Sequence, residues 1–263
     1  MYSFDALIEH DMGGAVLRNR LRLADYDKFY QNVYPGAVNS AGSMVSISAY
    51  NNLTERENFF NQTDLIFDIN QGDITHRMLV GAELGRQDTV NFRETGYFGA
   101  PGSTVTSQSV SVSNPQPNLP ITYRQSASDA DNAGVADTAA LYVQDQMHIG
   151  EKWQFIAGLR YDRFAMDFTP ARRGARIEQT DDMLSPRAGL IYQATPDFNL
   201  YASYSKAFVP RAGDQLASLT PSNANLDPEE FSNHEIGMKW QLSQGLFTSL
   251  ALYRLDRGNV AVA

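Results

Sequence analysis

Three arginines at alternate positions are the first residues in the chain whose spacing suggests binding chemistry. Arg18, Arg20 and Arg22 would share one face of a strand, because side chains on a β-strand alternate between its two faces. That face needs water, and its positive charge could attract an anion. The alternative is structural: the arginines pair with carboxylates such as Asp5 and Glu9 of the preceding strand. We favour the ion pairs.

Aromatic side chains in a long polar segment suggest a second kind of contact. Tyr97, Phe98 and Tyr123 lie between Arg93 and Ala136, a stretch rich in Ser, Thr, Asn, Gln and Pro. Structureless connections longer than about 12–15 residues are uncommon in compact domains and tend to be binding loops or disordered. The three rings could therefore stack on the apolar or aromatic parts of a ligand. The alternative is that they are ordinary loop aromatics.

Motifs for catalysis or metal binding are not found in the sequence. The chain has no Cys, no nucleophile elbow and no phosphate-binding glycine loop. His10, His76, His148 and His234 are far apart and match no metal-ligand spacing. The segment 129–134 begins like a calcium loop, but alanine occupies positions where ligands are required. We therefore predict no enzyme and no resident metal or cofactor; a hydrolase on a small barrel is an alternative without a motif.

Composition narrows the classes further. The chain has 263 residues, with 21 basic and 30 acidic side chains and a net charge of −9, which argues against a nucleic-acid partner. It contains no run of about 18 apolar residues, so a membrane-spanning helix is excluded. A transmembrane β-barrel is compatible with the sequence, because its strands need only about ten residues of alternating character.

Alternation with a period of two identifies the strands. The segment from Thr138 to Tyr161 reads as a hairpin with a tight turn at 150–152, and its second half places apolar residues on one face and polar residues on the other. Met44 to Asn70 contains neither Pro nor Gly, which predicts one very long strand. Ordinary strands run about 5–6 residues, so this length is informative.

Short and long connections alternate along the chain. Short turns are expected near 11–14, 70–73, 150–152, 194–197 and 243–245, and long loops near 31–43, 93–136, 169–180 and 209–230. This places every long loop at one end of an up-and-down meander, with the apolar faces toward lipid and the polar faces toward a lumen. The expected fold is an all-β, antiparallel transmembrane barrel, here an incomplete one of about ten strands. Expected interface anchors are Trp153, Tyr161, Tyr192, Phe198 and Trp240.

The order and spacing of several phrases resemble one family, the TonB-dependent siderophore receptors of the Gram-negative outer membrane, particularly the ferrichrome and catecholate types. The matching phrases are INQGDITHRMLVGAEL (69–84), DTAALYVQDQMHI (137–149), GLRYD (158–162), LSPRAGLIYQATPDFNLYASYSKAF (184–208), NLDPEEFSNHEIGMKW (225–240) and LALYRLDRGNV (250–260). They cover most of residues 60–260, and together they are specific.

The resemblance implies a barrel of roughly 22 strands whose lumen holds a plug domain. It implies import of an iron(III)–siderophore complex, with the TonB complex acting through the plug and outer-membrane lipid around the wall. The whole chain, residues 1–263, is then expected to be a central fragment of the barrel domain, without the plug domain and the last strands. A ferric catecholate is anionic, so the arginine face could attract it. The alternative function is a soluble β-rich module that binds sugar or protein through its long loops.

Overall fold

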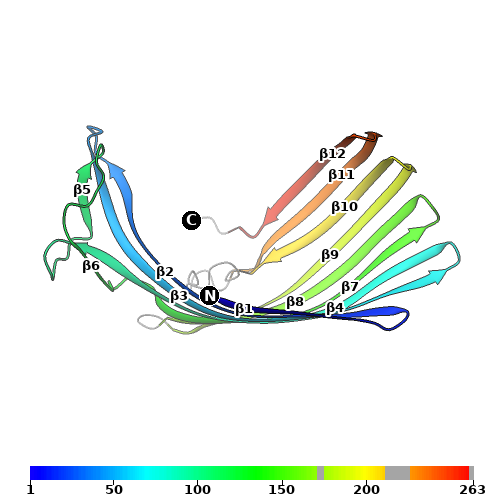
Figure 1. The fold of residues 1–263 in the computed structure, drawn as a ribbon, viewed down its shortest axis with the longest axis horizontal. Coiled ribbons are helices and arrows are strands. Elements are labelled where there is room, and N and C mark those ends of the chain that lie inside the picture. The colour runs from blue at the N-terminus through cyan, green and yellow to red at the C-terminus, as the bar shows by residue number, and fades with distance from the viewer. Residues whose placement is uncertain (171–174, 211–225, 261–263) are drawn as a thin grey trace.

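The structure, a computed structural model, describes residues 1–170, 175–210 and 226–260. The regular structure in these residues consists of strands only. Ten strands follow one another as an antiparallel meander in the order β1-β2-β3-β4-β7-β8-β9-β10-β11-β12, and two short strands, β5 and β6, attach to β3 and β4. Figure 1 shows the sheet bent into an open trough. The predicted antiparallel up-and-down architecture is confirmed.

The bounds of the strands follow the predicted hairpins at the short turns, but several strands extend into segments that were expected to be loops. The strands are β1 (Tyr2–Asp11), β2 (Ala15–Val38), β3 (Met44–Gln71), β4 (Ile74–Phe98), β5 (Ser107–Ser111), β6 (Ile121–Arg124), β7 (Asp131–Ile149), β8 (Trp153–Pro170), β9 (Ile177–Thr195), β10 (Phe198–Val209), β11 (Glu229–Ser243) and β12 (Leu246–Gly258). The expected long strand is therefore β3, with 28 residues. Within the described residues β1 pairs only with β2 and β12 only with β11, so both edges of the sheet are open.

The two ends of the sheet differ, as the alternation of connections predicted. The turns β1–β2, β3–β4, β7–β8, β9–β10 and β11–β12 are short and gather at one end. Gly150 turns the chain between β7 and β8 with a φ of 57°, a left-handed conformation that glycine adopts without strain. Of the long connections predicted at the other end, most of 209–230 and part of 169–180 lie outside the described residues.

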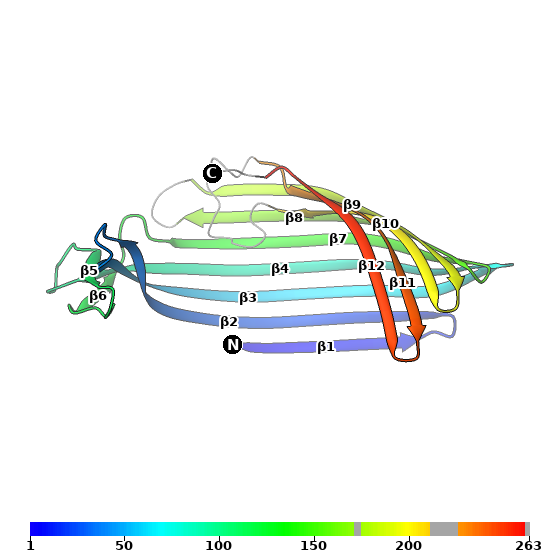
Figure 2. The same ribbon diagram turned by 90° about the horizontal axis from the view of Figure 1, so that it is seen from above.

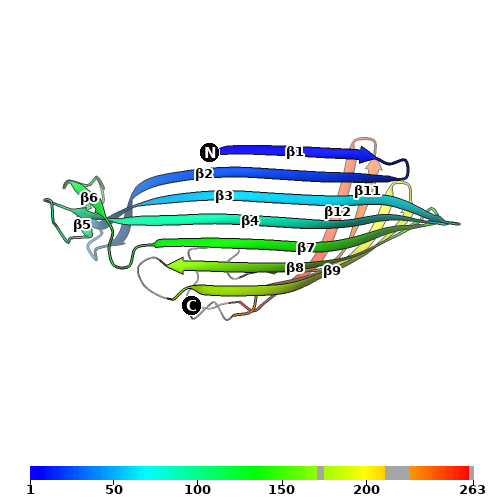
Figure 3. The same ribbon diagram turned by 90° about the horizontal axis from the view of Figure 1, so that it is seen from below.

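The two faces of the sheet also differ. Large apolar side chains on one face are 41–64% exposed, among them Leu141, Val143, Trp153, Leu159, Tyr161, Leu184, Leu190, Leu200, Ile236, Trp240, Leu250 and Leu252. Two ring pairs near the short turns, Trp153 with Tyr192 at 4.4 Å and Phe198 with Trp240 at 5.6 Å, lie where an aromatic girdle is expected. We call this apolar face the outer face and the opposite face the inner face. Figure 3 shows β1, β2, β3, β4, β7, β8 and β9 lying side by side in this sheet.

The segment from Arg93 to Ala136 was expected to be a structureless loop, and this was wrong. Strand β4 continues to Phe98 and β7 begins at Asp131. Beyond the pair Tyr50–Thr95 the strands β3 and β4 separate, and β3 takes β5 as its partner while β4 takes β6. The loop expected at 31–43 is likewise mostly strand, because β2 runs to Val38.

A small core fills the space between the separated strands. It consists of Val45, Ile47, Ala49, Phe98 and Val110, with Ile121 and Tyr123 packed against it. We call residues 99–130 the tip. The tip stands at the end of the sheet opposite the short turns (Figure 2). No helix in the described part of the chain is long and apolar enough to cross a membrane.

Candidate functional site

The arginine face lies on the inner face, and its structural interpretation is confirmed for two of the three residues. Arg18 lies 2.6 Å from Glu9, and Arg22 lies 3.5 Å from Asp5. The register of β1 and β2 places each pair directly across the ladder. Arg20 forms no ion pair within the described residues, and it lines an inner hollow of about 550 Å³ together with Gln62 and Glu83. Of the three, Arg20 keeps a charge free to attract an anion.

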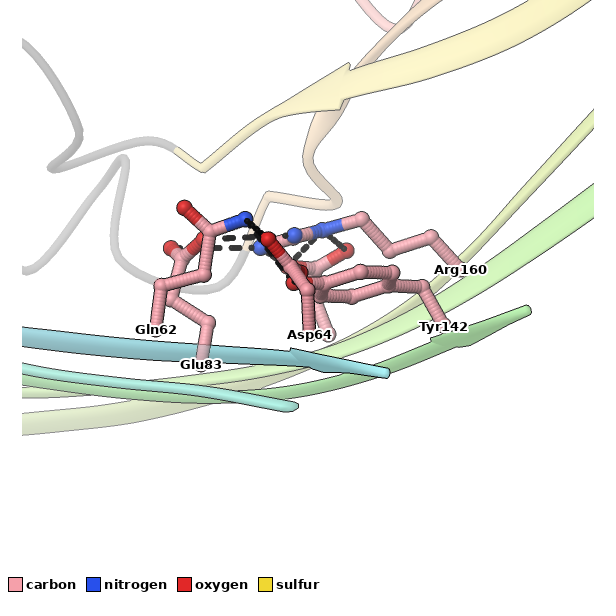
Figure 4. A network of polar contacts seen from close by, with 6 residues as sticks. Gln62, Asp64, Glu83, Tyr142 and Arg160 are labelled. Atoms are coloured by element: carbon pink, nitrogen blue, oxygen red, sulfur yellow. Dashed lines mark hydrogen bonds and ion pairs between the residues drawn. The ribbon is translucent and has the colours of Figure 1, made fainter. Parts of the chain in front are cut away.

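A polar network crosses four strands of the inner face next to this hollow (Figure 4). The hydroxyl of Tyr142 donates to Asp64 at 2.5 Å, and the amide of Gln62 donates to Tyr142 at 2.9 Å. Arg160 binds Glu83 at 3.3 Å and Asp162 at 2.8 Å. Its guanidinium also lies 5.3 Å from the centre of the Tyr142 ring.

The network stabilises the sheet and leaves few polar groups available to bind a ligand. The labelled side chains in Figure 4, from β3, β4, β7 and β8, rise from one face of the sheet and meet there. Asp64 is buried, and the carboxylates of Glu83 and Asp162 are occupied by Arg160. Networks of this kind hold strands in one register because each polar group is satisfied by its neighbours. We therefore infer that this network makes the lumen wall rigid.

The structure places the three predicted stacking rings in or beside the tip core. Phe98 is 1% exposed, and its ring is enclosed by the core. Tyr97 is 9% exposed, and the guanidinium of Arg124 covers its ring at 3.7 Å. Tyr123 packs on the same core, where burial raises the pKa of its phenol. Contact of these rings with a ligand stays a prediction, and Phe98 has no free face for it in this conformation.

A second aromatic group lies on the inner face, in the half of β2 and β3 farthest from the short turns. The rings of Tyr30 and Tyr34 each meet the ring of Tyr50 edge-on at 5.6 Å. The guanidinium of Arg93 lies 4.2 Å from the centre of the Tyr50 ring, and the ammonium of Lys28 lies 5.1 Å from that of Tyr30. Cations at these distances are attracted to aromatic faces.

Register shows that this group belongs to the inner face. Asn32 pairs with Tyr50 across β2 and β3, and Arg93 pairs with Asn52 across β3 and β4. Tyr50 lies an even number of residues from Asp64 on β3, and Arg93 lies an even number from Glu83 on β4, so their side chains share the inner face with the network. Asn32 is directly opposite Tyr50 and therefore lies on the same face. We call the following inner-facing residues the vestibule wall: Tyr26, Lys28, Tyr30, Asn32, Tyr34, Tyr50, Asn52, Thr54, Arg56, Thr89, Asn91 and Arg93.

Strand β2 is longer than a strand needs to be to cross a bilayer. A tilted strand of about 9–11 residues spans a bilayer. Strand β2 has 24 residues, and Tyr26 is already the twelfth from its start at the short-turn end. The vestibule wall therefore faces the mouth of the lumen on the side of the long connections.

Charges are segregated across this part of the sheet. The vestibule wall carries three cations, Lys28, Arg56 and Arg93, and no carboxylate. The outer-facing positions of the same segments carry Asp25, Asp27, Glu55, Glu57, Asp88 and Glu94, with Arg86 as their cation. The chain as a whole has a net charge of −9. An anion is therefore attracted to the inside of this wall and repelled from its outside.

The tyrosines of the wall are linked by hydrogen bonds. The amide of Asn32 donates to the hydroxyl oxygen of Tyr50 at 3.3 Å. This bond and one from Tyr30 lower the pKa of Tyr50, because both stabilise its phenolate form. The same bond to Tyr50 raises the pKa of Tyr30. The pKa values of the two phenols are therefore linked, and both phenols lie near the guanidinium of Arg93.

Sequence reasoning missed the vestibule wall, although a signal was present. Tyr26, Lys28, Tyr30, Asn32 and Tyr34 alternate along the chain as a strand face would. Pro35 and Gly36 next to them read as a loop. In the structure Pro35 still pairs with Ile47, and the register shifts only after it.

The segment that begins like a calcium loop has a structural role. Asp129 accepts hydrogen bonds from the backbone N–H of Thr95 at 2.9 Å, from its hydroxyl at 2.9 Å, and from the backbone N–H of Ser126 at 2.7 Å. Its oxygens therefore join the end of the tip to β4. Within the described residues no group of three or more His, Asp or Glu side chains is placed to hold a metal ion.

Comparison with known proteins gives one consistent family. Residues 2–263 match the family model described as TonB dependent receptor-like, beta-barrel. The metal-pseudopaline receptor CntO of Pseudomonas aeruginosa is 32% identical over 214 residues, which are 77% of this chain and 28% of CntO. The ferrioxamine B receptor of Salmonella typhimurium is 31% identical over 199 residues, which are 73% of this chain and 25% of that receptor.

A solved structure agrees with the fold. The crystal structure of the siderophore receptor PiuA from Acinetobacter baumannii superposes with a TM-score of 0.83 at 22% sequence identity, over 95% of this chain and 39% of PiuA. The identity is low, so this likeness supports the fold alone. The chain spans 28% of CntO and 25% of the ferrioxamine B receptor, so it corresponds to one part of such a protein.

Proposed function

Because the chain belongs to the TonB-dependent receptor family, whose barrels lie in the Gram-negative outer membrane, we propose that it forms part of a receptor wall that takes up iron–siderophore complexes. The partners of the whole protein are then the iron chelate, outer-membrane lipid around the apolar outer face, and the TonB complex acting through a plug domain. The role of this segment is binding and passage, with no chemical step. The apolar outer face speaks against a soluble binding module.

The charge segregation of the vestibule wall supports this proposal and points to the ligand class. Relatives are named as receptors for metal-pseudopaline, ferrioxamine B and catecholate siderophores, so their names alone do not select a ligand. The wall presents Lys28, Arg56 and Arg93 without a carboxylate. Iron(III) held by three catecholates carries a net negative charge, whereas iron(III) held by three hydroxamates is neutral. The wall favours the anionic chelate.

The tyrosines suit the same ligand. Catechol rings are flat and electron-rich, and Tyr30, Tyr34 and Tyr50 offer aromatic edges and faces beside the cations. A chelate on the wall would therefore contact both ring surface and positive charge. We also propose that Tyr97 and Tyr123 contact the chelate and that Arg20 attracts it, in addition to the residues of the vestibule wall.

Uptake of radioactive iron tests the proposal. Cells lacking the gene, complemented with the complete protein, should import iron from an anionic tris-catechol chelate only when TonB is active. The triple variant K28Q/R56Q/R93Q should weaken binding of that chelate by at least about tenfold, equivalent to about 1.4 kcal/mol.

The matched control is R163Q, which removes a cation from the outer face and should leave binding unchanged. If the complemented cells show no TonB-dependent uptake of any iron chelate, the proposed function is wrong. If the triple variant binds the anionic chelate as tightly as the wild type, the vestibule wall is not the site.

A further inference from the structure

Arg93 contacts two parts of the protein, the vestibule wall and the residues that attach the tip to β4. On one side its guanidinium lies 4.2 Å from the centre of the Tyr50 ring. On the other side its Nε lies 3.7 Å from Oδ1 of Asp129. Its backbone N–H also donates to the carbonyl of Ala130 at 2.9 Å. A movement of this side chain therefore changes its contacts both with the vestibule wall and with Asp129.

Asp129 fastens the end of the tip to β4, in addition to the pairing of β5 with β3 and of β6 with β4. Its side chain is 5% exposed, and it accepts hydrogen bonds from Thr95 and Ser126. These donors are neutral. Within the described residues Arg93 is the only cation paired with it. Since a nearly buried carboxylate depends on nearby positive charge, Arg93 stabilises the fastened tip.

The hydrogen bonding of Arg93 itself is incomplete. Its distance of 3.7 Å to Asp129 is too long for a hydrogen bond, and its Nε–H is buried without any partner in the described structure. The side chain as a whole is 40% exposed. A turn of the side chain toward an anion on the vestibule wall would give this Nε–H the acceptor that Asp129 does not provide.

We propose that Arg93 couples occupancy of the vestibule wall to the attachment of the tip. When an anionic chelate lies on the wall, the guanidinium turns from Asp129 to the chelate. Asp129 then keeps only neutral donors, and the junction at residues 125–130 loosens. The proposal rests on the proposed function, because it needs an anion on the wall.

Thermodynamic linkage gives the coupling a direction. A ligand that draws Arg93 away from Asp129 weakens the tip attachment, and a change that weakens the attachment frees Arg93 and tightens ligand binding by the same factor. Coupling of this kind requires differential interaction with two states. The shared guanidinium supplies it, because a turn toward the chelate lengthens a contact with Asp129 that is already 3.7 Å long.

Hydrogen–deuterium exchange of the complete protein in detergent tests the coupling. The probes are a hexadentate tris-catechol chelate of iron(III), which is anionic, and a neutral hexadentate tris-hydroxamate chelate. In the wild type, saturation with the anionic chelate should speed exchange in peptides from 99–130 by about tenfold, which corresponds to about 1.4 kcal/mol. The neutral chelate should leave these peptides unchanged.

Two variants isolate the residue pair. R93Q should raise exchange in 99–130 without any ligand and abolish the further response to the anionic chelate. D129N keeps a side-chain oxygen for Thr95 and Ser126 but removes the charge, so its tip should no longer respond to ligand. R56Q is the matched control, because Arg56 lies on the same wall and donates to Thr89, away from the tip. R56Q should bind more weakly yet keep the response at saturation.

Binding is measured separately by calorimetry, so the two proposals can fail independently. If the anionic chelate binds and exchange in 99–130 does not change, the coupling is overturned and the proposed function stands. If R93Q still responds at saturation, Arg93 is not the coupling residue. If neither chelate binds the wild-type protein, the proposed function fails and the coupling falls with it.

Discussion

The ring of Tyr142 lies flat against the backbone of Gly81 on the neighbouring strand, where a Cβ atom would come within 2.3 Å of a ring carbon. This close approach lets the hydroxyl of Tyr142 reach Asp64 at 2.5 Å. A pair of the same kind recurs at Gly237, where a Cβ would lie 2.5 Å from the ring of Tyr201. Glycine on one strand thus allows a tyrosine of the next strand to lie along the lumen wall.

Replacing Gly81 by Ala should lift the Tyr142 ring away from the wall and break its bond to Asp64. A buried carboxylate that loses a hydrogen bond costs about 1–3 kcal/mol, so G81A should lower the free energy of unfolding by that amount. Urea unfolding of the complete protein in lipid vesicles measures the change. The control is G189A, also on the inner face, where the nearest atoms to an added Cβ lie at 3.8 Å. Equal stability of G81A and G189A would contradict this account.

Two asparagines of β2 and β3 are hydrogen-bonded to each other on the outer face. The amide of Asn19 donates to Asn61 at 3.1 Å and to Thr63 at 2.8 Å, and the amide of Asn61 donates back to Asn19 at 3.1 Å. N19L should destabilise the protein by about 1–3 kcal/mol, because the side-chain oxygen of Asn61 loses the amide that donates to it, where lipid supplies no other donor. The double variant N19L/N61L should recover most of that loss. Unfolding in vesicles gives both values, and a double variant worse than the sum of the single changes would contradict the prediction.

Like charges face each other on the outer side of β2, β3 and β4. Asp25 is directly opposite Glu57, which is directly opposite Asp88, and Asp27 is opposite Glu55. Like charges at such positions destabilise a sheet, by about 0.2–1 kcal/mol a pair. E57K should therefore raise the free energy of unfolding, and the gain should shrink as salt is added. A variant that is no more stable at low salt would show that these carboxylates are already neutralised.

The lowered pKa of Tyr50 predicts the pH dependence of ligand binding. Asn32 donates to its hydroxyl oxygen, so Tyr50 loses its proton at lower pH than a free phenol does. The phenolate adds negative charge to the wall. Affinity for an anionic chelate should therefore fall as the pH rises toward the pKa of Tyr50. Calorimetry over a pH series measures this.

Two variants check the assignment of that titration. N32A removes the donated hydrogen bond and should move the fall in affinity to higher pH. Y50F has no proton to lose and should remove the fall. If wild type and Y50F follow the same curve, another group is responsible.

The strands and their order could be predicted because alternation is a local property of the chain. Residues 138–161 show both faces of a hairpin without reference to the rest of the protein. The pairing of Arg18 with Glu9 was also predictable, since a short turn fixes the register between neighbouring strands.

The tip and the vestibule wall depend on contacts between distant segments, and this is why they were missed. Separation of β3 from β4 beyond Tyr50 is decided by the partners that β5 and β6 provide, which no local pattern reveals. The role of Gly81 is equally hidden, because the ring that needs its missing side chain comes from Tyr142 on another strand.

The opposite charges on the two sides of β2, β3 and β4 also matter before any contact is made. A negatively charged chelate diffusing along the cell surface is pushed away from the exterior of the wall and drawn over its rim. Steering of this kind raises arrival rates most at low ionic strength. Capture from dilute surroundings would then be faster than the size of the opening alone allows.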